Sequence, residues 1–310
     1  MDAMFELRRL RMLHEFALRG TLAAVAEALS YSPSTISQQL DQLEKDAAVP
    51  LFVADGRRLR LTEHGELLAA YAERALDEDE RVRGELEALR PGAAPVRVAL
   101  MQTAALALLP DALALLAARE PDLRLEAAAV PPEEGLFELS ARRFDLVVAE
   151  QYPGHTRAHR DGLTRRILGR DPIRLAVPRG DRARGLRDLA DRPWVLEPEG
   201  TAARQWAVQQ CRAAGFEPDV RYALPDLTAH VGLVAAGRAV AMLPDLVWAG
   251  ARPPVRTITL PDAPTREVFV ATRAASGTRR RVGAVVDALA DALTARTSAV
   301  AGGGRGGASA

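Results

Sequence analysis

The feature that most constrains the fold is a change of hydrophobic pattern at Pro91-Gly-Ala-Ala-Pro95. Before this segment, apolar residues recur at helical spacing; after it, short apolar runs alternate with amphipathic stretches. A stretch rich in Pro and Gly between two such patterns is typical of a linker. The 310 residues have room for two or three domains. We therefore expect a helical N-terminal part and an α/β C-terminal part, joined by a linker at residues 91–95.

The N-terminal part predicts three short helices and a hairpin. Apolar spacing places the helices at residues 4–18, 22–29 and 33–45, with Thr21 and Ser32 as N-caps and Pro33 at the first helical position. Asp55-Gly56 is a strong turn signal between two short strands within residues 53–61. This order of elements predicts a winged helix-turn-helix domain over residues 1–62.

A long helix is expected over residues 63–90. Leu68, Ala75, Val82 and Leu89 recur every seven residues, with Ala72 and Leu86 in the companion position. Such a seam is typical of a short coiled coil. We expect this linker helix to join two copies of the chain into a homo-oligomer.

Residues 96–298 alternate between strand-like and helical patterns. Strands are expected at residues 96–100, 123–129, 145–149, 173–177, 194–196, 220–222, 239–243 and 268–271. Helices are expected at residues 104–119, 201–214, 226–236 and 279–296. This rhythm predicts an α/β domain with mostly parallel sheets. Residues 299–310 are Gly-, Ala- and Ser-rich and are expected to be disordered.

The third helix and the hairpin carry the chemistry that suits DNA. The helix begins with short or planar hydrogen-bonding side chains, which can contact phosphates or base edges: Ser32, Ser34, Thr35, Gln38 and Gln39. The hairpin carries Arg57, Arg58 and Arg60, which can reach phosphates or a narrow minor groove. Because Lys+Arg and Asp+Glu both total 41, such binding needs a local basic face. Each feature alone also fits an ordinary solvated surface.

Residues 5–65 resemble the DNA-binding domain of LysR-type transcriptional regulators. The resemblance rests on Leu10, Leu13 and Phe16 followed by GTLAAVAEAL, on SPSTISQQLDQLE, on VPLF and on GRRLRLTEHG. It implies that the third helix enters the major groove of a double-stranded operator and that the hairpin touches the minor groove. It also implies that the long helix dimerises the chain, and we expect two dimers to pair into a tetramer. The residues it implies at the DNA are Ser34, Thr35, Ser37, Gln38, Gln39, Arg57 and Arg58. Thr21, Ser32 and Arg60 are further candidates for this contact.

Two departures from the family pattern affect this DNA contact. Ala47-Ala48 stands where Leu-Gly is common, and Val53-Ala54 stands where Glu-Arg is common. Losing that arginine removes one usual contact to the DNA backbone. Pro33-Ser34-Thr35 replaces the common Gln-Pro-Ala, so the operator bases cannot be taken from a relative.

The resemblance continues to about residue 296 and implies an effector-binding domain like a periplasmic binding protein. Its first lobe is expected at residues 96–168 and 252–298 and its second at 169–251, with a small-molecule effector in the cleft. Ligands of such sheets lie beyond the strand ends, near helix N-termini. The expected contacts are Met101, Gln102, Thr103, Ala149, Thr201 and Thr228. Gln102, Thr103, Thr201 and Thr228 are the expected donors and acceptors, and each could instead be a simple helix cap. No Arg or Lys stands out as a carboxylate clamp, so the sequence favours a weakly polar or aromatic effector, or none.

Several other function classes find no support in the sequence. His155 and His159 lack the glutamate of a zinc-protease motif, and no nucleophile elbow, P-loop or dinucleotide fingerprint is present, so we expect no metal, no cofactor and no enzyme. Cys211 alone cannot form an internal disulfide, and it fits a core residue better than a redox sensor. Residues 99–118 are apolar but contain Pro110 and Asp111, which favours a buried strand and helix over a membrane span.

The sequence therefore predicts a cytoplasmic one-component regulator that binds an operator under control of an effector. Contact with RNA polymerase is a further expectation of the family resemblance. The alternative is a small-molecule binding protein or enzyme whose N-terminal helices only dimerise.

Overall fold

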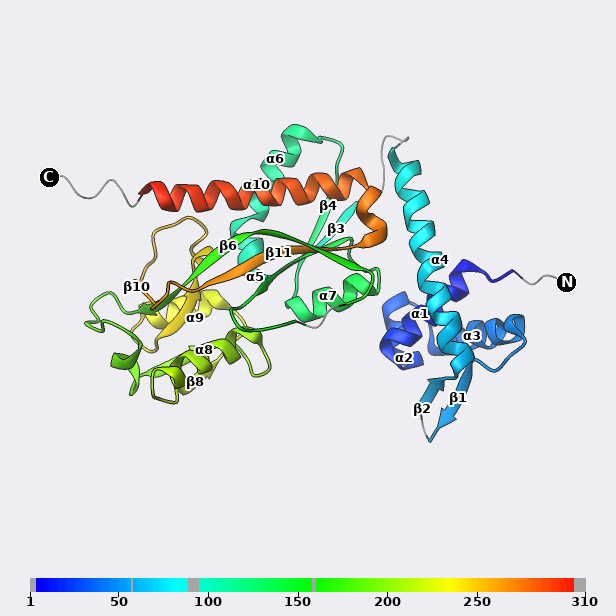
Figure 1. Cartoon of the computed structure of the whole chain (residues 1–310), viewed down its shortest axis with the longest axis horizontal. Coiled ribbons are helices and arrows are strands. Elements are labelled where there is room, and N and C mark those ends of the chain that lie inside the picture. The colour runs from blue at the N-terminus through cyan, green and yellow to red at the C-terminus, as the bar shows by residue number, and fades with distance from the viewer. Residues whose placement is uncertain (1–3, 57, 89–94, 158–159, 304–310) are drawn as a thin grey trace. The chain divides into compact units, whose positions relative to one another are not determined.

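A computed structural model describes residues 4–56, 58–88, 95–157 and 160–303 of the chain (Figure 1). Its contacts divide it into two compact units, Met1–Pro91 and Gly92–Ala310. Each unit has its own hydrophobic core and is described by itself.

The first unit consists of three helices, a hairpin and a long helix. The elements are α1 (Leu7–Arg19), α2 (Leu22–Leu29), α3 (Pro33–Ala47), β1 (Phe52–Asp55), β2 (Arg58–Leu61) and α4 (Glu63–Ala88). Both expected caps are confirmed: Thr21 accepts a hydrogen bond from the Ala24 N–H, and Ser32 accepts one from the Thr35 N–H. The core lies between the helices, with Leu13, Ile36 and Leu43 wholly buried. These elements form the expected winged helix-turn-helix.

Helix α4 does not present the expected seam along its whole length. Leu68 and Ala72 are buried in the core of their own unit, so they are not open to a partner chain. The large apolar side chains that α4 exposes are Leu67, Tyr71, Val82 and Leu86. The seven-residue spacing did not distinguish these two faces, because α1 packs on the first half of the helix. Leu89, the last expected seam residue, lies outside the described residues.

The second unit alternates strands and helices. Its helices are α5 (Gln102–Ala107), α6 (Leu109–Arg119), α7 (Pro132–Ser140), α8 (Ala202–Ala213), α9 (Leu227–Ala235) and α10 (Arg280–Gly303), with three short 3₁₀ turns at Leu186–Leu189, Asp245–Trp248 and Ala274–Thr278. Its strands are β3 (Val96–Leu100), β4 (Leu125–Ala129), β5 (Leu146–Gln151), β6 (Leu163–Val177), β7 (Pro193–Leu196), β8 (Asp219–Ala223), β9 (Ala241–Pro244), β10 (Arg256–Thr259) and β11 (Thr265–Arg273).

The main sheet is mixed, and the expectation of mostly parallel pairing was wrong. Its order is β10-β6-β11-β5-β3-β4, with β9 also paired to β6. β3 runs parallel to β4 and β5, whereas β6 and β11 run antiparallel to each other and to their other neighbours. The sequence predicted only the second half of β6, because the first half carries Thr164, Arg165 and Arg166 instead of an apolar run. β7 and β8 form a separate parallel pair.

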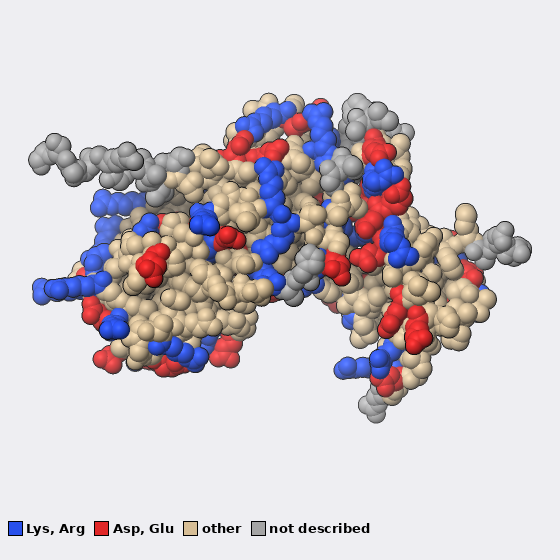
Figure 2. Space-filling model, viewed as in Figure 1, with Lys and Arg blue, Asp and Glu red and all other residues tan. Residues whose placement is uncertain are grey.

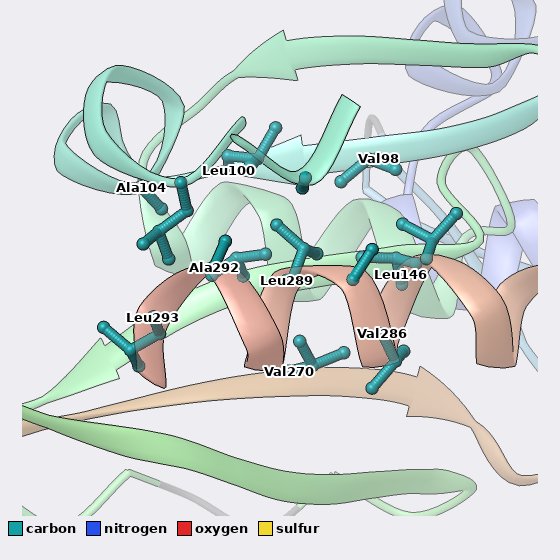
Figure 3. Close-up of a cluster of buried hydrophobic side chains, with 14 of the residues drawn as sticks. Val98, Leu100, Ala104, Leu146, Val270, Val286, Leu289, Ala292 and Leu293 are labelled. Carbon is teal, nitrogen blue, oxygen red and sulfur yellow. The ribbon is translucent and has the colours of Figure 1, made fainter. Parts of the chain in front are cut away.

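Helices cover both faces of the first lobe's sheet. The side chains of β5 alternate: Leu146 and Val148 join the core beneath α5, α6 and α10, whereas Val147 and Ala149 join the core beneath α7. Figure 3 shows α10 lying along the first of these cores, with Leu289 and Val286 directed at the sheet. Two further cores, one around Trp194 and one around Leu243, belong to the second lobe.

Two expected boundaries differ from the structure. β10 pairs with the second half of β6, and Val255 and Leu260 pack in the cores of the second lobe, so residues 252–260 do not belong to the first lobe as expected. Helix α10 continues to Gly303, so the tail is not disordered from residue 299. The rest of the expected tail, residues 304–310, and most of the expected linker, residues 91–94, lie outside the described residues.

Candidate nucleic-acid interface and ligand pocket

The N-terminus of α3 presents a small cluster of hydroxyl groups. Ser32 Oγ lies 2.8 Å from Ser34 Oγ and 2.8 Å from Thr35 Oγ1, and it accepts the Thr35 N–H at 3.1 Å. Ser32 and Ser34 are exposed, and Thr35 is half-buried. The first turn of a helix also offers unpaired backbone N–H donors and a partial positive charge. This end of α3 can therefore accept an anionic oxygen such as that of a phosphate.

Two glutamines on the next turn of α3 were both predicted to contact DNA, but they differ in exposure and hydrogen bonding. Gln38 is exposed, and its amide makes no hydrogen bond within the described part of the chain. Gln39 is half-buried, and its Oε1 accepts a hydrogen bond of 3.2 Å from Arg9 Nε. Ser37 is half-buried as well. Gln38 is thus free to donate and accept at once, whereas Gln39 is partly held by α1.

The β1–β2 hairpin carries the basic side chains of the same unit. Arg58 is exposed and has no ion-pair partner among the described residues. Arg60 lies 3.5 Å from Asp55 in a pair whose side chains are 69% and 63% exposed, which contributes little in water. Figure 2 shows basic and acidic side chains side by side at this hairpin. Arg57, the third expected arginine, lies outside the described residues.

One further basic residue beside α3 was missed from the sequence. The Arg8 guanidinium lies 5.1 Å from the centre of the Tyr31 ring, and both side chains are exposed. Tyr31 stands in the turn that leads into α3. In the sequence, the aromatic Tyr31 immediately before the third helix could have pointed to this pair. Thr21, by contrast, is exposed, and its hydroxyl caps α2.

In the second unit, one buried polar network is centred on an arginine. Arg266 is 2% exposed; its Nε and Nη2 donate to Asp171 Oδ2 at 2.9 and 2.8 Å, and Nη2 also donates to Thr103 Oγ1 at 2.6 Å. Asp171 Oδ1 accepts the Leu246 N–H at 3.0 Å. Thr103 is therefore a partner of this network. The sequence did not single out Arg266, because its partner Asp171 lies far away along the chain.

Two expected effector residues meet across the lobes through Asp226. Gln102, at the start of α5, donates to Asp226 Oδ1 at 2.5 Å and accepts the Leu227 N–H at 2.9 Å. Thr228 donates its hydroxyl to the same carboxylate oxygen at 2.6 Å. These bonds join the N-termini of α5 and α9, so the two lobes are held together at this point. Met101, immediately before α5, is buried.

The other two expected residues lie elsewhere. Ala149 is fully buried in the core beneath α7, so its side chain does not face the space between the lobes. Thr201 caps α8: its hydroxyl donates to the Pro198 carbonyl at 2.9 Å and accepts the Arg204 N–H at 3.3 Å. Glu197, another residue of the same loop after β7, lines a pocket.

A narrow pocket lies between the end of β5, the sheet and helices α8 and α9. Its lining residues are Tyr152, Ile173, Leu196, Glu197, Ala203, Arg204, Trp206, Ala207, Leu227, His230, Met242 and Pro244. Its free volume is about 10 Å³, which is about the need of one water molecule. The six residues expected from the sequence are not among those that line it in the described structure. Side chains therefore nearly fill this pocket in the conformation observed.

Burial shifts the proton equilibria of the pocket's polar groups. It raises the pKa of the Glu197 carboxyl to about 7, and the negative charge of Glu150 adds to this. It lowers the pKa of His230, whose Nε2 lies 2.8 Å from the Leu224 carbonyl oxygen. It also raises the pKa of the Tyr152 hydroxyl. The pocket thus combines an apolar wall with groups whose neutral forms are favoured.

The remaining sequence candidates do not assemble into a site. Within the described residues, no three His, Cys, Asp or Glu side chains could hold a metal ion, and His159 lies outside those residues. Cys211 is buried, and burial raises its thiol pKa to about 12, so the thiol stays protonated. Among the described helices, none has the length and apolar character needed to cross a membrane.

Both units match known protein families, and the descriptions of the two families name the same group of proteins. Residues 7–66 match the family described as "Bacterial regulatory helix-turn-helix protein, lysR family", and residues 90–294 match "LysR substrate binding domain". The transcriptional regulator TfdS of Cupriavidus pinatubonensis is 30% identical over 267 residues, covering 83% of this chain and 88% of its own. The transcriptional dual regulator GltC of Bacillus subtilis is 29% identical over 254 residues, covering 80% and 83%.

Solved structures have the same fold. A full-length variant of OxyR from Pseudomonas aeruginosa superposes with a TM-score of 0.66 at 21% identity, covering 92% of this chain and 95% of its own. Full-length CbnR in complex with its target DNA superposes with a TM-score of 0.51 at 23% identity, covering 92% and 100%.

Proposed function

Because this chain belongs to the LysR family of bacterial transcriptional regulators, we propose that α3 and the β1–β2 hairpin bind its operator and that a small molecule between the lobes modulates this binding. The observation that carries the DNA contact is the exposed polar N-terminus of α3, with Gln38 unengaged and Arg58 unpaired among the described residues of the same unit. CbnR, which shares the fold, has been solved on its target DNA.

We assign different roles to the polar residues of the DNA-binding unit. The hydroxyl cluster of Ser32, Ser34 and Thr35 donates to phosphates at the helix N-terminus. Gln38 reads a base edge, because a free amide can pair bidentately with adenine in the major groove. Arg58 and Arg60 neutralise phosphates beside the groove.

We assign the effector to the space between the lobes of the second unit. The contact of Gln102 with Asp226 closes this space, and the pocket beside Glu197 holds about one water, so a ligand requires the lobes to separate. Trp206, Tyr152 and Leu196 would then present an apolar wall to a weakly polar or aromatic molecule. A change in the angle between the lobes is the physical means by which such a ligand acts.

We also infer the oligomeric state and the cellular location of the protein from its family. The exposed apolar side chains Val82 and Leu86 of α4 are suited to a second copy of the helix. The relatives are named as transcriptional regulators, which supports a regulatory role and not an enzymatic one. We place the protein in the cytoplasm, where the operator and RNA polymerase, a further partner we propose, are accessible.

A gel-shift assay with the DNA upstream of the protein's own coding sequence tests this function. The full-length chain should retard the fragment, and Ser34→Glu with Gln38→Glu should abolish the shift, because one carboxylate would face a phosphate and the other a base edge in the negatively charged groove. Gln209→Glu, an exposed change on α8 in the other unit, is the matched control and should bind as the native chain does. Equal binding by the doubly substituted chain would support the alternative, in which the N-terminal helices only dimerise.

A further inference from the structure

A second hollow lies on the other face of the first lobe's sheet, beside α7. It is lined by Leu136, Arg157, Arg160, Leu163, Arg165, Phe269 and Ala271, and its free volume is about 280 Å³. That is far more than the 10 Å³ of the pocket beside Glu197, with which it shares no lining residue. Its volume falls near the range of small-molecule sites.

The floor of this hollow is apolar. Phe269 and Ala271 are fully buried on β11, and Leu136 of α7 is 7% exposed. All three belong to the core beneath α7, with Leu163 packed against it. The hollow is thus the open end of a hydrophobic core, and a ligand that fills it must carry an apolar body.

The rim of the hollow is cationic. The Arg165 guanidinium lies 3.7 Å from the centre of the Phe269 ring, and its Nη2 donates to Gln151 Oε1 at 2.9 Å. Gln151 is neutral, so this bond leaves Arg165 without an ion pair among the described residues. The side chain of Arg160 has neither an ion pair nor a hydrogen bond in the same described ranges. Two guanidinium groups without a carboxylate partner therefore border an apolar floor.

Arg157 differs, because protein carboxylates already neutralise it. Its side chain is 6% exposed, contacts Glu133 and lies 3.9 Å from the Glu150 carboxylate. Its Nε also donates to the Glu150 carbonyl oxygen at 3.0 Å. Burial lowers the pKa of Arg165, and the positive charge of Arg157 lowers it further, while the negative charge of Glu267 opposes both effects. An anion between Arg160 and Arg165 would relieve the repulsion on this rim.

We propose that this hollow is a second ligand site, which takes a small monocarboxylate with an aromatic body. Arg165 has five N–H donors, and the bond to Gln151 uses one, so four remain, of which a bidentate pair with a carboxylate needs two. Stacking on Phe269 holds the guanidinium plane in place, and the ring of the ligand lies over Leu136 and the half-buried Leu163. This site goes beyond the proposed function, which places the effector between the lobes.

Calorimetric titration of the full-length protein with phenylacetate tests the proposal. Phenylacetate should bind saturably, and Arg165→Gln and Arg160→Gln should each weaken it by at least about tenfold. Arg166→Gln is the matched control, because Arg166 neighbours Arg165 on β6 but pairs with Asp287 on the opposite face; its affinity should match the native value. 2-Phenylethanol, which lacks the charge, should bind at least about tenfold more weakly than phenylacetate.

The contradicting results are equally definite. The proposal fails if phenylacetate does not bind, if it binds Arg165→Gln as tightly as the native chain, or if 2-phenylethanol binds equally well. A crystal soaked with 4-bromophenylacetate locates the ligand by the anomalous signal of bromine. A peak beside Phe269 supports the site, and a peak only beside Trp206 assigns the binding to the space between the lobes and overturns it.

Discussion

Glu197→Gln should change how the stability of the second lobe depends on pH. Burial raises the pKa of Glu197 from 4.5 to about 7, so folding favours the protonated form. Stability from this group is therefore fully present below pH 4.5 and is lost as the pH rises through 7. A pKa near 7 in the fold and 4.5 in the unfolded chain corresponds to a loss of about 2 kcal/mol between pH 5.5 and 8. Glutamine stays neutral and cannot contribute this loss.

Urea unfolding followed by tryptophan fluorescence measures the effect. The three tryptophans, Trp194, Trp206 and Trp248, all lie in the second lobe, so the signal reports on the lobe that holds Glu197. The free energy of unfolding of Glu197→Gln relative to the native chain should rise by about 2 kcal/mol between pH 5.5 and 8. Glu199→Gln, whose carboxylate is 87% exposed, is the control and should leave the slope unchanged. If the free energy of unfolding varied with pH in the same way for Glu197→Gln and the native chain, Glu197 could not be the source of the pH dependence.

Four further predictions follow from the contacts described above. Gln38→Ala should cost about 1–3 kcal/mol at one base position of the operator in a binding assay with single-base variants, and a uniform loss over all sequences would make Gln38 a phosphate contact. Arg58→Ala should weaken binding to every sequence and reduce the slope of log K against log salt by about 1; an unchanged slope would remove Arg58 from the phosphate contacts. Leu86→Asp should shift the chain toward the monomer in analytical ultracentrifugation, and an unaltered mass would exclude this part of α4 from the interface. Arg266→Met should lower the free energy of unfolding by about 3–5 kcal/mol in urea, because Asp171 would be left as a buried, unpaired charge; a loss under about 1 kcal/mol would contradict that cause.

The elements that the sequence predicted well are those with local signals. Thr21, Ser32 and Pro33 mark helix starts by their own chemistry, and the structure places α2 and the start of α3 where those residues indicate. The first half of β6 gave no such signal, because its polar, Arg-rich face looks outward while its backbone pairs with β11. The orientation of the sheet therefore could not be read from apolar runs alone.

The contacts between the lobes were predicted less well, because they join distant residues. Arg266 and Asp171 are separated by 95 positions, and Gln102 and Asp226 by 124. The rule that ligands gather beyond strand ends pointed to the loop after β7 and to Thr201; in the structure Thr201 caps a helix, and Glu197 of the same loop lines the pocket. Alternation along β5 directs Ala149 to the opposite face, and this could be decided only once the helix covering each face was known.

The most direct test of the central claim is in vitro selection of genomic fragments by the full-length protein, with and without a panel of metabolites. We predict enrichment of a recurring, partly palindromic sequence, and loss of that enrichment in the chain carrying Ser34→Glu and Gln38→Glu. Enrichment that survives these substitutions, or the absence of any enriched sequence, would contradict a DNA contact made by α3.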